Sequence, residues 1–426
     1  ACLSFFIISL LLFQTYGLEG GQPFIVTLLI FDITMPIIIS FITLLFQPFF
    51  VFLRNRALKK ARIKMSKFNL TDGGLTVIGI TGSYGKTSTK EFLTTILSRN
   101  FSVLSTKDHE NSEIGIARRV LNDLNEGHQI FVVEMGAYNK GGINLLCDIV
   151  RPEIGILTGV NVQHLSTFGS MDNILSAEGG REMLQNLPKN GMLFVNGGNK
   201  HCLDLYKRAN ISKKIYALNR SRVDADMWAE EIEVKKDKLS FVAVTKEKEM
   251  WHFDVNIAGG QNVENLLGAI IIAKELGMSM EEIAAACLDI KPSQAGIMLK
   301  KGIYGIEIID SSHSSNPDGV MADLDYLNVF SGKKGVVMPC LIELGSKSIE
   351  THIKIGKKIA QVCDFAIITT KDKFKEIKMG AIAGGMTEGQ ILLCDKSQEI
   401  LNHITTHCKE GDAVLLEGRV PAELIR

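Results

Sequence analysis

The segment Leu75-Thr-Val-Ile-Gly-Ile80 runs directly into Thr81-Gly-Ser-Tyr-Gly-Lys-Thr-Ser88. The apolar and β-branched residues of the first segment predict a buried strand, and the second predicts a glycine turn that opens a helix. Such a turn aims backbone N–H groups and the positive end of the helix at an anion. We therefore predict a phosphate-binding loop whose contact residues are Gly82, Ser83, Gly85, Lys86, Thr87 and Ser88.

The residue types of this loop indicate a nucleoside triphosphate and its metal. Lys86 can reach the β- and γ-phosphates, and the Thr87 hydroxyl suits Mg²⁺. The spacing is T-G-x-x-G-K-T-S, with Ile80 where the more common form has glycine. The alternative is an ordinary strand, turn and helix that contains Gly-Lys-Thr by chance. We favour ATP and Mg²⁺ as the ligands.

Length and composition limit the class of protein. A chain of 426 residues predicts two or three domains. Lys and Arg together number 47, as do Asp and Glu, and this balance argues against nucleic acid as the main partner. The eight cysteines are scattered without a C-x-x-C pair. They therefore predict reduced cytosolic thiols and neither a disulfide framework nor a zinc site.

The beginning of the chain differs from the rest. Ala1–Tyr16 has no charged residue, and Pro23–Leu53 has only Asp32. A membrane-spanning helix needs ~20 apolar residues, so the second stretch is long enough to cross a bilayer, with a kink or a shallow hairpin at Pro36. Residues 54–64 then carry six basic side chains and no acid. Basic residues beside a membrane-spanning helix usually lie in the cytoplasm, so we predict that residues 54–64 lie on the cytoplasmic side of a cell membrane. A cleaved signal peptide is the alternative for the first stretch.

Short apolar strands alternate with helical segments from Leu75 onward, which predicts an α/β fold with a mostly parallel sheet. We expect a transmembrane anchor and basic linker at residues 1–70, a central ATP-binding domain at 71–298 and a smaller Rossmann-like domain at 299–426. Ala225–Asp254 looks like a β-rich insertion. The expected strands are residues 75–80, 130–134, 154–158, 192–196, 303–310, 335–339, 365–370, 391–395 and 413–417, and the expected helices are 87–99, 114–125, 177–187 and 263–276.

Three side chains follow predicted strands and could hold a metal. Glu134 ends one strand, at the edge of an open sheet where ligands bind, and a carboxylate there can hold Mg²⁺. His164 lies in the polar turn after another strand, and Glu178 starts a predicted helix. The alternatives are a capping acid at Glu134, a structural histidine at His164 and a solvated first-turn acid at Glu178.

A second group could bind the nucleoside. Asn262 and Asn265 are three residues apart, on one face of a predicted helix, and their amides could read a purine edge or cap the helix. Asp310 ends a strand and enters the polar loop Ser311–Asn316, where it could grip a ribose or cap a turn.

Taken together, these motifs resemble the Mur ligase family, in particular its branch that adds D-alanyl-D-alanine to a muramoyl tripeptide. The resemblance covers residues 75–426. It is carried by T-G-S-Y-G-K-T-S, Asn111-Ser-Glu-Ile-Gly-Ile116, E-M-G-A, H-L-S-T-F-G-S, G-G-Q-N-V-E-N, D-S-S-H-S-S-N-P and Ile342-Glu-Leu-Gly-Ser346 followed by His352.

The resemblance implies an ATP-dependent, ADP-forming amide ligase of peptidoglycan synthesis, in which a carboxylate becomes an acyl phosphate that an amine attacks. It implies that Lys86, His164 and Glu178 are catalytic. It also places Thr87 and Glu134 on a first Mg²⁺ and His164 on a second. The same resemblance implies that Asn262 and Asn265 face adenine and that Asp310 faces ribose.

The chain departs from the family pattern at several positions. Glu178 stands where the family often has a lysine modified to a carbamate, and we interpret it as a substitute oxygen ligand. Ile297 replaces a usual arginine, and Glu417-Gly-Arg419 replaces Lys-Gly-Ser. Both changes remove positive charge near the expected chemistry.

At the front of the chain, a membrane segment stands in place of the family's uridine-nucleotide-binding domain, which suggests a lipid-linked precursor or a membrane partner. A catalytically altered nucleotide-binding regulatory or scaffold protein is the alternative function. A transporter is disfavoured, because Asp32 is the one charged residue in the apolar stretch Pro23–Leu53.

Overall fold

The computed structural model describes residues 22–68, 74–107, 110–220, 223–312 and 316–424. The chain divides into two compact units, Ala1–Lys60 and Ala61–Arg426. The predicted apolar segment Ala1–Tyr16 lies outside the described residues.

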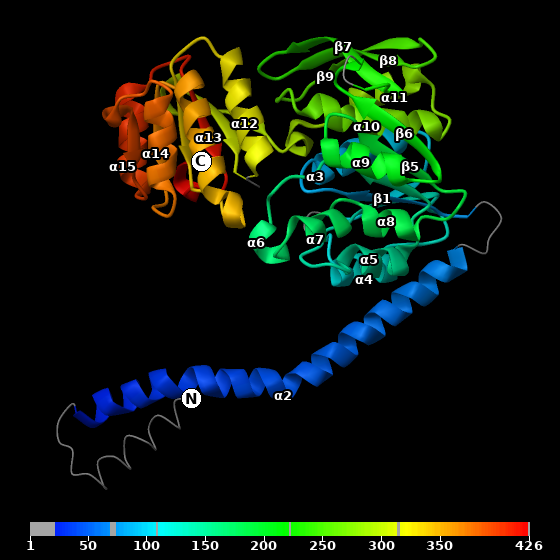
Figure 1. The fold of residues 1–426 in the computed structure, drawn as a ribbon, viewed down its shortest axis with the longest axis horizontal. Helices are drawn as coiled ribbons and strands as arrows, with labels where there is room; N and C mark the ends of the chain where they lie inside the picture. The colour runs from blue at the N-terminus through cyan, green and yellow to red at the C-terminus, as the bar shows by residue number, and fades with distance from the viewer. Residues whose placement is uncertain (1–21, 69–73, 108–109, 221–222, 313–315, 425–426) are drawn as a thin grey trace. The chain divides into compact units, whose positions relative to one another are not determined.

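The first described element is one long helix, α2 (Gln22–Phe68), with Pro36 and Pro48 inside it (Figure 1). The sequence analysis allowed either a kinked helix or a shallow hairpin at Pro36, and the structure has one continuous helix. Within it, Leu28–Phe68 is long and apolar enough to cross a membrane, by length and composition. Most of the large apolar side chains described between Ile25 and Leu53 are exposed. A helix that is apolar on all sides needs an apolar environment around it.

The last turns of α2 belong to the folded unit that follows. Ala61 and Met65 are completely buried. Arg62 forms an ion pair with Asp148 at 2.6 Å, and Lys64 Nζ donates to the carbonyl of Leu121 at 3.1 Å. Arg62 and Lys64, which the sequence assigned to a basic linker, thus attach the end of α2 to the central domain.

A nine-stranded sheet organises the central domain in the order β2-β3-β1-β4-β5-β6-β7-β8-β9. The pairs from β2 to β7 are parallel, whereas β7, β8 and β9 pair antiparallel. The predicted β-rich insertion is therefore an antiparallel extension of the same sheet. The strands are β1 (Thr76–Thr81), β2 (Val103–Ser105), β3 (Ile130–Glu134), β4 (Ile154–Leu157), β5 (Met192–Asn196), β6 (Ser212–Ala217), β7 (Met227–Val234), β8 (Leu239–Thr245) and β9 (Met250–Val255).

Helices on the faces of this sheet close its core. The central strands are buried along almost their whole length, as expected for parallel strands covered on both faces. The helices are α3 (Lys86–Leu97), α4 (Glu113–Asn122), α5 (Gly142–Val150), α6 (Leu165–Phe168), α7 (Met171–Ser176), α8 (Arg181–Asn186), α9 (Lys200–Arg208), α10 (Asn262–Glu275) and α11 (Met280–Cys287). Phe92, Leu93 and Ile96 of α3 are fully buried, and each contributes about 1.5–3 kcal/mol to folding.

A six-stranded sheet forms the C-terminal domain, in the order β10-β11-β15-β12-β13-β14. The pair β10–β11 is antiparallel and the other pairs are parallel. Its elements are β10 (Met298–Lys301), β11 (Glu307–Ser311), α12 (Pro317–Tyr326), β12 (Lys334–Met338), α13 (Ser348–Val362), β13 (Phe365–Ile368), α14 (Phe374–Ala383), β14 (Ile391–Leu393), α15 (Ser397–His407) and β15 (Ala413–Glu417). The predicted α/β architecture with two sheets is confirmed.

Two local predictions were wrong. Glu178 does not start a helix; it lies in the turn between α7 and α8. Gly180, with φ 77°, takes the left-handed backbone conformation that ends the turn, so the expected helix at 177–187 begins only at Arg181. Likewise β11 begins at Glu307, because a short 3-10 turn occupies Ile303–Gly305.

Candidate functional site

Strand register brings the predicted site residues to one edge of the central sheet. Strand β1 lies between β3 and β4, with Ile80 opposite Glu134 and Thr81 opposite Leu157. All three strands are parallel, so their carboxyl ends meet at the same edge. The loop after β1, Glu134 and the segment that begins at Thr158 are therefore neighbours.

The glycines of the loop after β1 are required by its geometry. Gly82 has φ 145° and Gly85 has φ 76°, both in the region that favours glycine. A Cβ atom on Gly82 would lie 2.3 Å from Thr158 Oγ1, and one on Gly85 would lie 2.6 Å from Asn265 Oδ1. A side chain at either position would clash inside the loop. With glycine at both, the inner surface of the loop is formed by backbone atoms.

Helix α3 begins at Lys86 without a side-chain cap. Its first N–H groups have no partner within the helix, and the helix dipole adds positive charge there. Lys86 Nζ folds back to the carbonyl of Gly82 at 2.5 Å, and Thr87 is exposed on the first turn. The loop thus offers backbone donors, an ammonium group and a hydroxyl, which are the groups that bind phosphate with Mg²⁺.

Glu134 is held at the end of β3 by a buried cation. Only 5% of its surface is exposed. Its Oε2 lies 3.7 Å from Nζ of the fully buried Lys90, and Asn111 Nδ2 donates to Oε1 at 3.2 Å. A buried carboxylate without such a partner would strongly destabilise the fold. Sequence reasoning missed Lys90, although it lies one turn after Lys86 on the same helix.

Glu178, His164 and Ser83 converge beside the loop. The Ser83 hydroxyl donates to Glu178 Oε2 at 2.8 Å, and His164 Nε2 lies 3.9 Å from Glu178 Oε1. Glu178 is almost completely buried, whereas His164 keeps about a fifth of its side chain exposed. The sequence predicted that Glu178 and His164 share one crevice, and the structure brings them together.

The arrangement suits Mg²⁺ that is held partly by substrate. Within the described ranges, no group of three or more His, Cys, Asp or Glu side chains is placed to hold a metal ion without other ligands. Mg²⁺ is usually bound through one or two carboxylates together with phosphate oxygens and water. Glu134, His164, Glu178 and Thr87 therefore fit Mg²⁺ that arrives with a nucleotide.

Asn262 differs from its predicted contact with adenine. It is completely buried, and its Nδ2 donates to the carbonyls of Ala258 at 2.9 Å and Ala295 at 3.1 Å. Its Oδ1 accepts from Asn265 Nδ2 at 3.1 Å. Every polar atom of the side chain is used inside the protein, so Asn262 braces the start of α10 and has no atom left for a purine.

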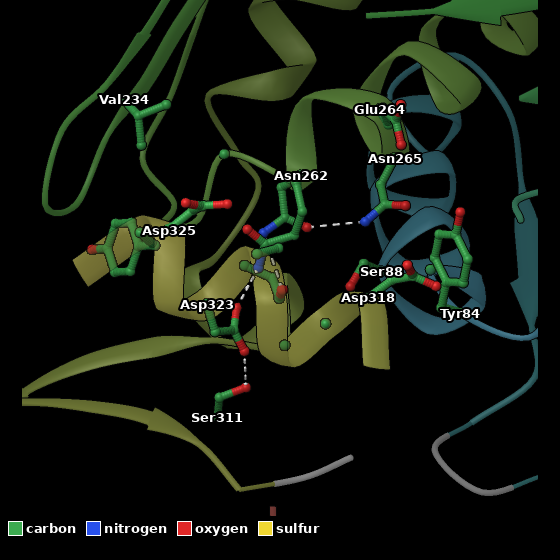
Figure 2. A pocket seen from close by; sticks show the side chains of 18 of the residues that line it. Tyr84, Ser88, Val234, Asn262, Glu264, Asn265, Ser311, Asp318, Asp323 and Asp325 are labelled. Carbon is green, nitrogen blue, oxygen red and sulfur yellow. Dashed lines mark hydrogen bonds between the residues drawn. The ribbon is translucent and has the colours of Figure 1, made fainter. Parts of the chain in front are cut away.

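Asn265 lies over the loop instead. Thr89 Oγ1 donates to its Oδ1 at 3.4 Å, and the same oxygen packs against Gly85. Figure 2 shows Asn265 bonded to Asn262 and facing the cavity. Asn265 thus remains beside the nucleotide loop.

Asp310 also differs from its predicted contact with ribose. Lys300 Nζ donates to Oδ2 at 2.7 Å, and the Ser312 hydroxyl and N–H donate to Oδ1 at 2.6 and 3.1 Å. Burial acts to raise the pKa of this carboxyl, but the bonds from Lys300 and Ser312 outweigh it and lower the pKa below the usual value. Asp310 therefore works as an internal acceptor that joins β10 to the loop after β11.

A cavity of about 550 Å³ lies between the loop, the start of α10 and helix α12 (Figure 2). Among the described residues that line it, the charged side chains are the acids Glu264, Asp318, Asp323 and Asp325, with no Lys or Arg. Sequence reasoning missed the three aspartates, although α12 starts just after a strand-end polar loop, a recognisable signal. With acids on its walls, the cavity can accept a polyphosphate only through the loop and divalent ions.

Asp323 is the most constrained of these acids. Gln261 Nε2 donates to Oδ1 at 2.8 Å and the Ser311 hydroxyl donates to Oδ2 at 2.5 Å. Burial raises the pKa of the Asp323 carboxyl. Gln261 precedes α10 of the central domain, so its bond to Asp323 joins the two domains across the cavity. The bond from Ser311, at the end of β11, lies within the C-terminal domain.

At the two positions where the family pattern has a cation, Ile297 and Glu417, this chain has no positive side chain. Ile297 is 1% exposed and packs in the main apolar core. Glu417 is equally buried at the end of β15, opposite Ser311, whereas Arg419 is exposed. The two positive charges that the family pattern places here are absent from the buried site.

Comparison with known proteins gives consistent results along both domains. Residues 80–273 match the model of the Mur ligase middle domain, and residues 298–420 match that of the Mur ligase glutamate ligase domain. Together the two matches cover most of the folded part of the chain.

The chain also resembles individual ligases. It is 28% identical over 358 residues to UDP-N-acetylmuramoyl-tripeptide–D-alanyl-D-alanine ligase of Mycobacterium tuberculosis, covering 81% of this chain and 68% of that protein. The enzyme of the same name from Escherichia coli is 27% identical over 283 residues, 66% of this chain and 61% of that protein. A crystal structure of MurF from Acinetobacter baumannii superposes with a TM-score of 0.76 at 25% identity, covering 86% of this chain and 78% of that chain.

Proposed function

Because this chain belongs to the Mur ligase family, whose members form amide bonds with ATP and Mg²⁺, we propose that it joins D-alanyl-D-alanine to the carboxylate of a peptidoglycan precursor. The relatives named above carry this activity in their names. The chain spans only part of their length, so the substrates are assigned here as a proposal.

One observation supports the proposal most directly. The uncapped start of α3 lies beside Glu134, and Ser83 of the same loop bonds to Glu178, which faces His164. A phosphoryl group held by the loop would meet backbone donors, Lys86 and two acidic metal ligands, Glu134 from the end of β3 and Glu178 from the turn between α7 and α8. Phosphoryl transfer needs this kind of positioning and charge neutralisation.

The residues take the following roles in the proposed reaction. The loop amides and Lys86 would hold the phosphates. Thr87, Glu134, His164 and Glu178 would hold Mg²⁺, which would supply charge neutralisation at the transferring phosphoryl group. The acceptor carboxylate attacks that group, and ADP leaves. The amine of the dipeptide then attacks the acyl phosphate, and phosphate leaves as the amide forms. Asn265 borders the nucleotide, while Asn262 keeps α10 in place.

We further propose that α2 anchors the enzyme in the cell membrane, with the ligase domains in the cytoplasm. The support is the length and apolar character of Leu28–Phe68 and the basic residues that follow Leu53. Carbonate washing of membranes should leave the full chain in the pellet. Release into the supernatant would argue against a spanning helix.

The function can be tested with purified full-length protein. We expect ADP release to require both UDP-N-acetylmuramoyl tripeptide and D-alanyl-D-alanine, with the ligated product identified by mass spectrometry. A parallel reaction with the lipid-linked form of the same precursor distinguishes a soluble acceptor from a membrane acceptor. ADP release that needs neither substrate, or none with either precursor, would contradict the proposal.

The alternative, a catalytically altered nucleotide-binding regulatory or scaffold protein, is favoured by one observation. Ile297 and Glu417 are buried where the family pattern has cations. Nucleotide affinity that persists without acyl-phosphate formation would support this second function. Trapping the acyl phosphate with hydroxylamine, which yields a hydroxamate, separates the two functions.

A further inference from the structure

Glu343 of the C-terminal domain reaches into the predicted metal site of the central domain. Its Oε2 lies 2.6 Å from His164 Nδ1, the shortest contact that His164 makes among the described residues. His164 Nε2 faces Glu178 at 3.9 Å. The imidazole therefore lies between one carboxylate from each domain.

The loops that carry His164 and Glu343 also contact each other through their backbones. His164 has φ 63° and Glu343 has φ 65°, a left-handed conformation that is unfavourable for residues with a side chain. The N–H of Ser166 donates to the Glu343 carbonyl at 3.0 Å. Gly345, with φ 51°, is in ordinary van der Waals contact with this loop, since a Cβ there would lie 3.4 Å from Ser166 N. A chance meeting of long side chains would not require matching backbones.

The contact determines which histidine nitrogen is available. The carboxylate of Glu343 can only accept, so Nδ1 carries the proton in the neutral imidazole. The lone pair then lies on Nε2, on the side of Glu178 and Ser83. A carboxylate that fixes the tautomer and ring orientation of a metal-binding histidine is a common arrangement, and losing it typically weakens metal binding 10–100-fold.

We propose that Glu343 is a positioning residue, which orients His164 toward the metal only when the C-terminal domain lies against the central domain. Metal binding at His164 thereby becomes sensitive to the contact between the two domains. This inference rests on the proposed function, in which His164 is a metal ligand. Glu343 touches neither substrate nor metal in this role and acts through the histidine.

The test measures Mn²⁺ binding to the full chain in the presence of ADP, by electron paramagnetic resonance. We expect Glu343→Ala to weaken Mn²⁺ affinity about tenfold or more. Glu343→Gln keeps an acceptor oxygen for Nδ1–H and should show an intermediate loss. ADP affinity without metal should not change. The matched control is Glu350→Ala, since Glu350 is an exposed acid on α13 that pairs with Lys347 and Lys354.

A double-mutant cycle tests whether Glu343 acts through His164. His164→Ala should weaken Mn²⁺ binding, and adding Glu343→Ala should produce no further loss. A further tenfold loss in the double variant, or wild-type affinity in Glu343→Ala, would overturn the proposal. If the wild-type protein binds no Mn²⁺ with ADP, the proposed function fails first. Thermal melting of each variant identifies any that fails to fold.

Discussion

Two groups of predicted ligands, His164 with Glu178 and Asn262 with Asp310, differ in how many hydrogen bonds their side chains already make inside the protein. In the first group, His164 Nε2 and Glu178 Oε1 lie 3.9 Å apart, and the one side-chain hydrogen bond that Glu178 accepts from a described residue comes from Ser83 of the nucleotide loop. In the second group, Asn262 donates to the carbonyls of Ala258 and Ala295. Asp310 accepts from Lys300 and Ser312. Burial is similar for Glu178, Asn262 and Asp310, so the number of internal partners decides which side chain can still bind a ligand.

The same contrast occurs within one short segment. Glu182 is as buried as Glu178, four residues earlier, but accepts from the N–H groups of Gly141 at 2.8 Å and Asn144 at 3.0 Å. The Ser176 hydroxyl donates to it as well, at 3.0 Å. Glu182 therefore caps the start of α5, whereas Glu178 points at the loop. These two acids form a natural pair of test and control positions.

The largest effect is expected at Lys86. Lys86→Met removes the ammonium group at the phosphates, and we expect ADP release to fall about 10³-fold. Among the described residues, the Lys86 ammonium bonds to Gly82 of its own loop alone, so the melting temperature should hardly move. Steady-state ADP release and thermal melting measure the two quantities. Turnover within tenfold of wild type would show that the loop does not hold the transferring phosphate.

The next largest effect separates the two buried acids. Glu178→Gln should lower turnover about 10²-fold with little loss of stability, because it removes a proposed metal ligand. Glu182→Gln should instead destabilise the fold by about 1–2 kcal/mol, since it weakens the acceptor at the start of α5. Turnover and urea unfolding of both variants make the comparison. Equal turnover losses would mean that burial alone explains Glu178.

Asn262 and Asn265 provide a comparison of stability. Asn262→Ala leaves two carbonyls without their donors in the interior, and we expect a loss of about 2–3 kcal/mol. Asn265→Ala should cost less, because part of its side chain faces the cavity. Urea unfolding checks the order. A larger loss of ADP affinity than of stability in Asn262→Ala would restore its predicted role at adenine.

The smallest effect concerns Asp310 and depends on pH. Its folded pKa is lowered, so its contribution is present above the pKa of the unfolded chain and disappears as pH falls through the folded value. Because Lys300 is about a third exposed, we expect Asp310→Asn to cost only about 1 kcal/mol at pH 7. The difference should shrink below about pH 4. Urea unfolding of both proteins at pH 7 and pH 3 measures it; an equal gap at both pH values would contradict the ion pair.

The residues that make up the site were harder to predict than the fold. The strands at Ile130–Glu134, Met192–Asn196 and Ala413–Glu417 have the predicted bounds, because apolar runs between polar turns mark buried strands. No local pattern of residues indicates that Lys90 lies beside Glu134 or that Glu343 lies beside His164. Those partners lie far apart in the chain, and only the packing of helices and loops brings them together.

Four features could be predicted from the order of the amino acids alone: the nucleotide loop, the alternation of strands and helices, the apolar N-terminal helix and the family. Each of these depends on neighbouring residues, through hydrophobic periodicity, glycine geometry and helix ends. Which polar side chains remain available to a ligand depends instead on contacts formed in the folded protein. Asn262 and Asp310 found internal partners, whereas Glu178 and His164 kept a side toward the loop, and long-range contacts of this kind leave no local pattern in the chain.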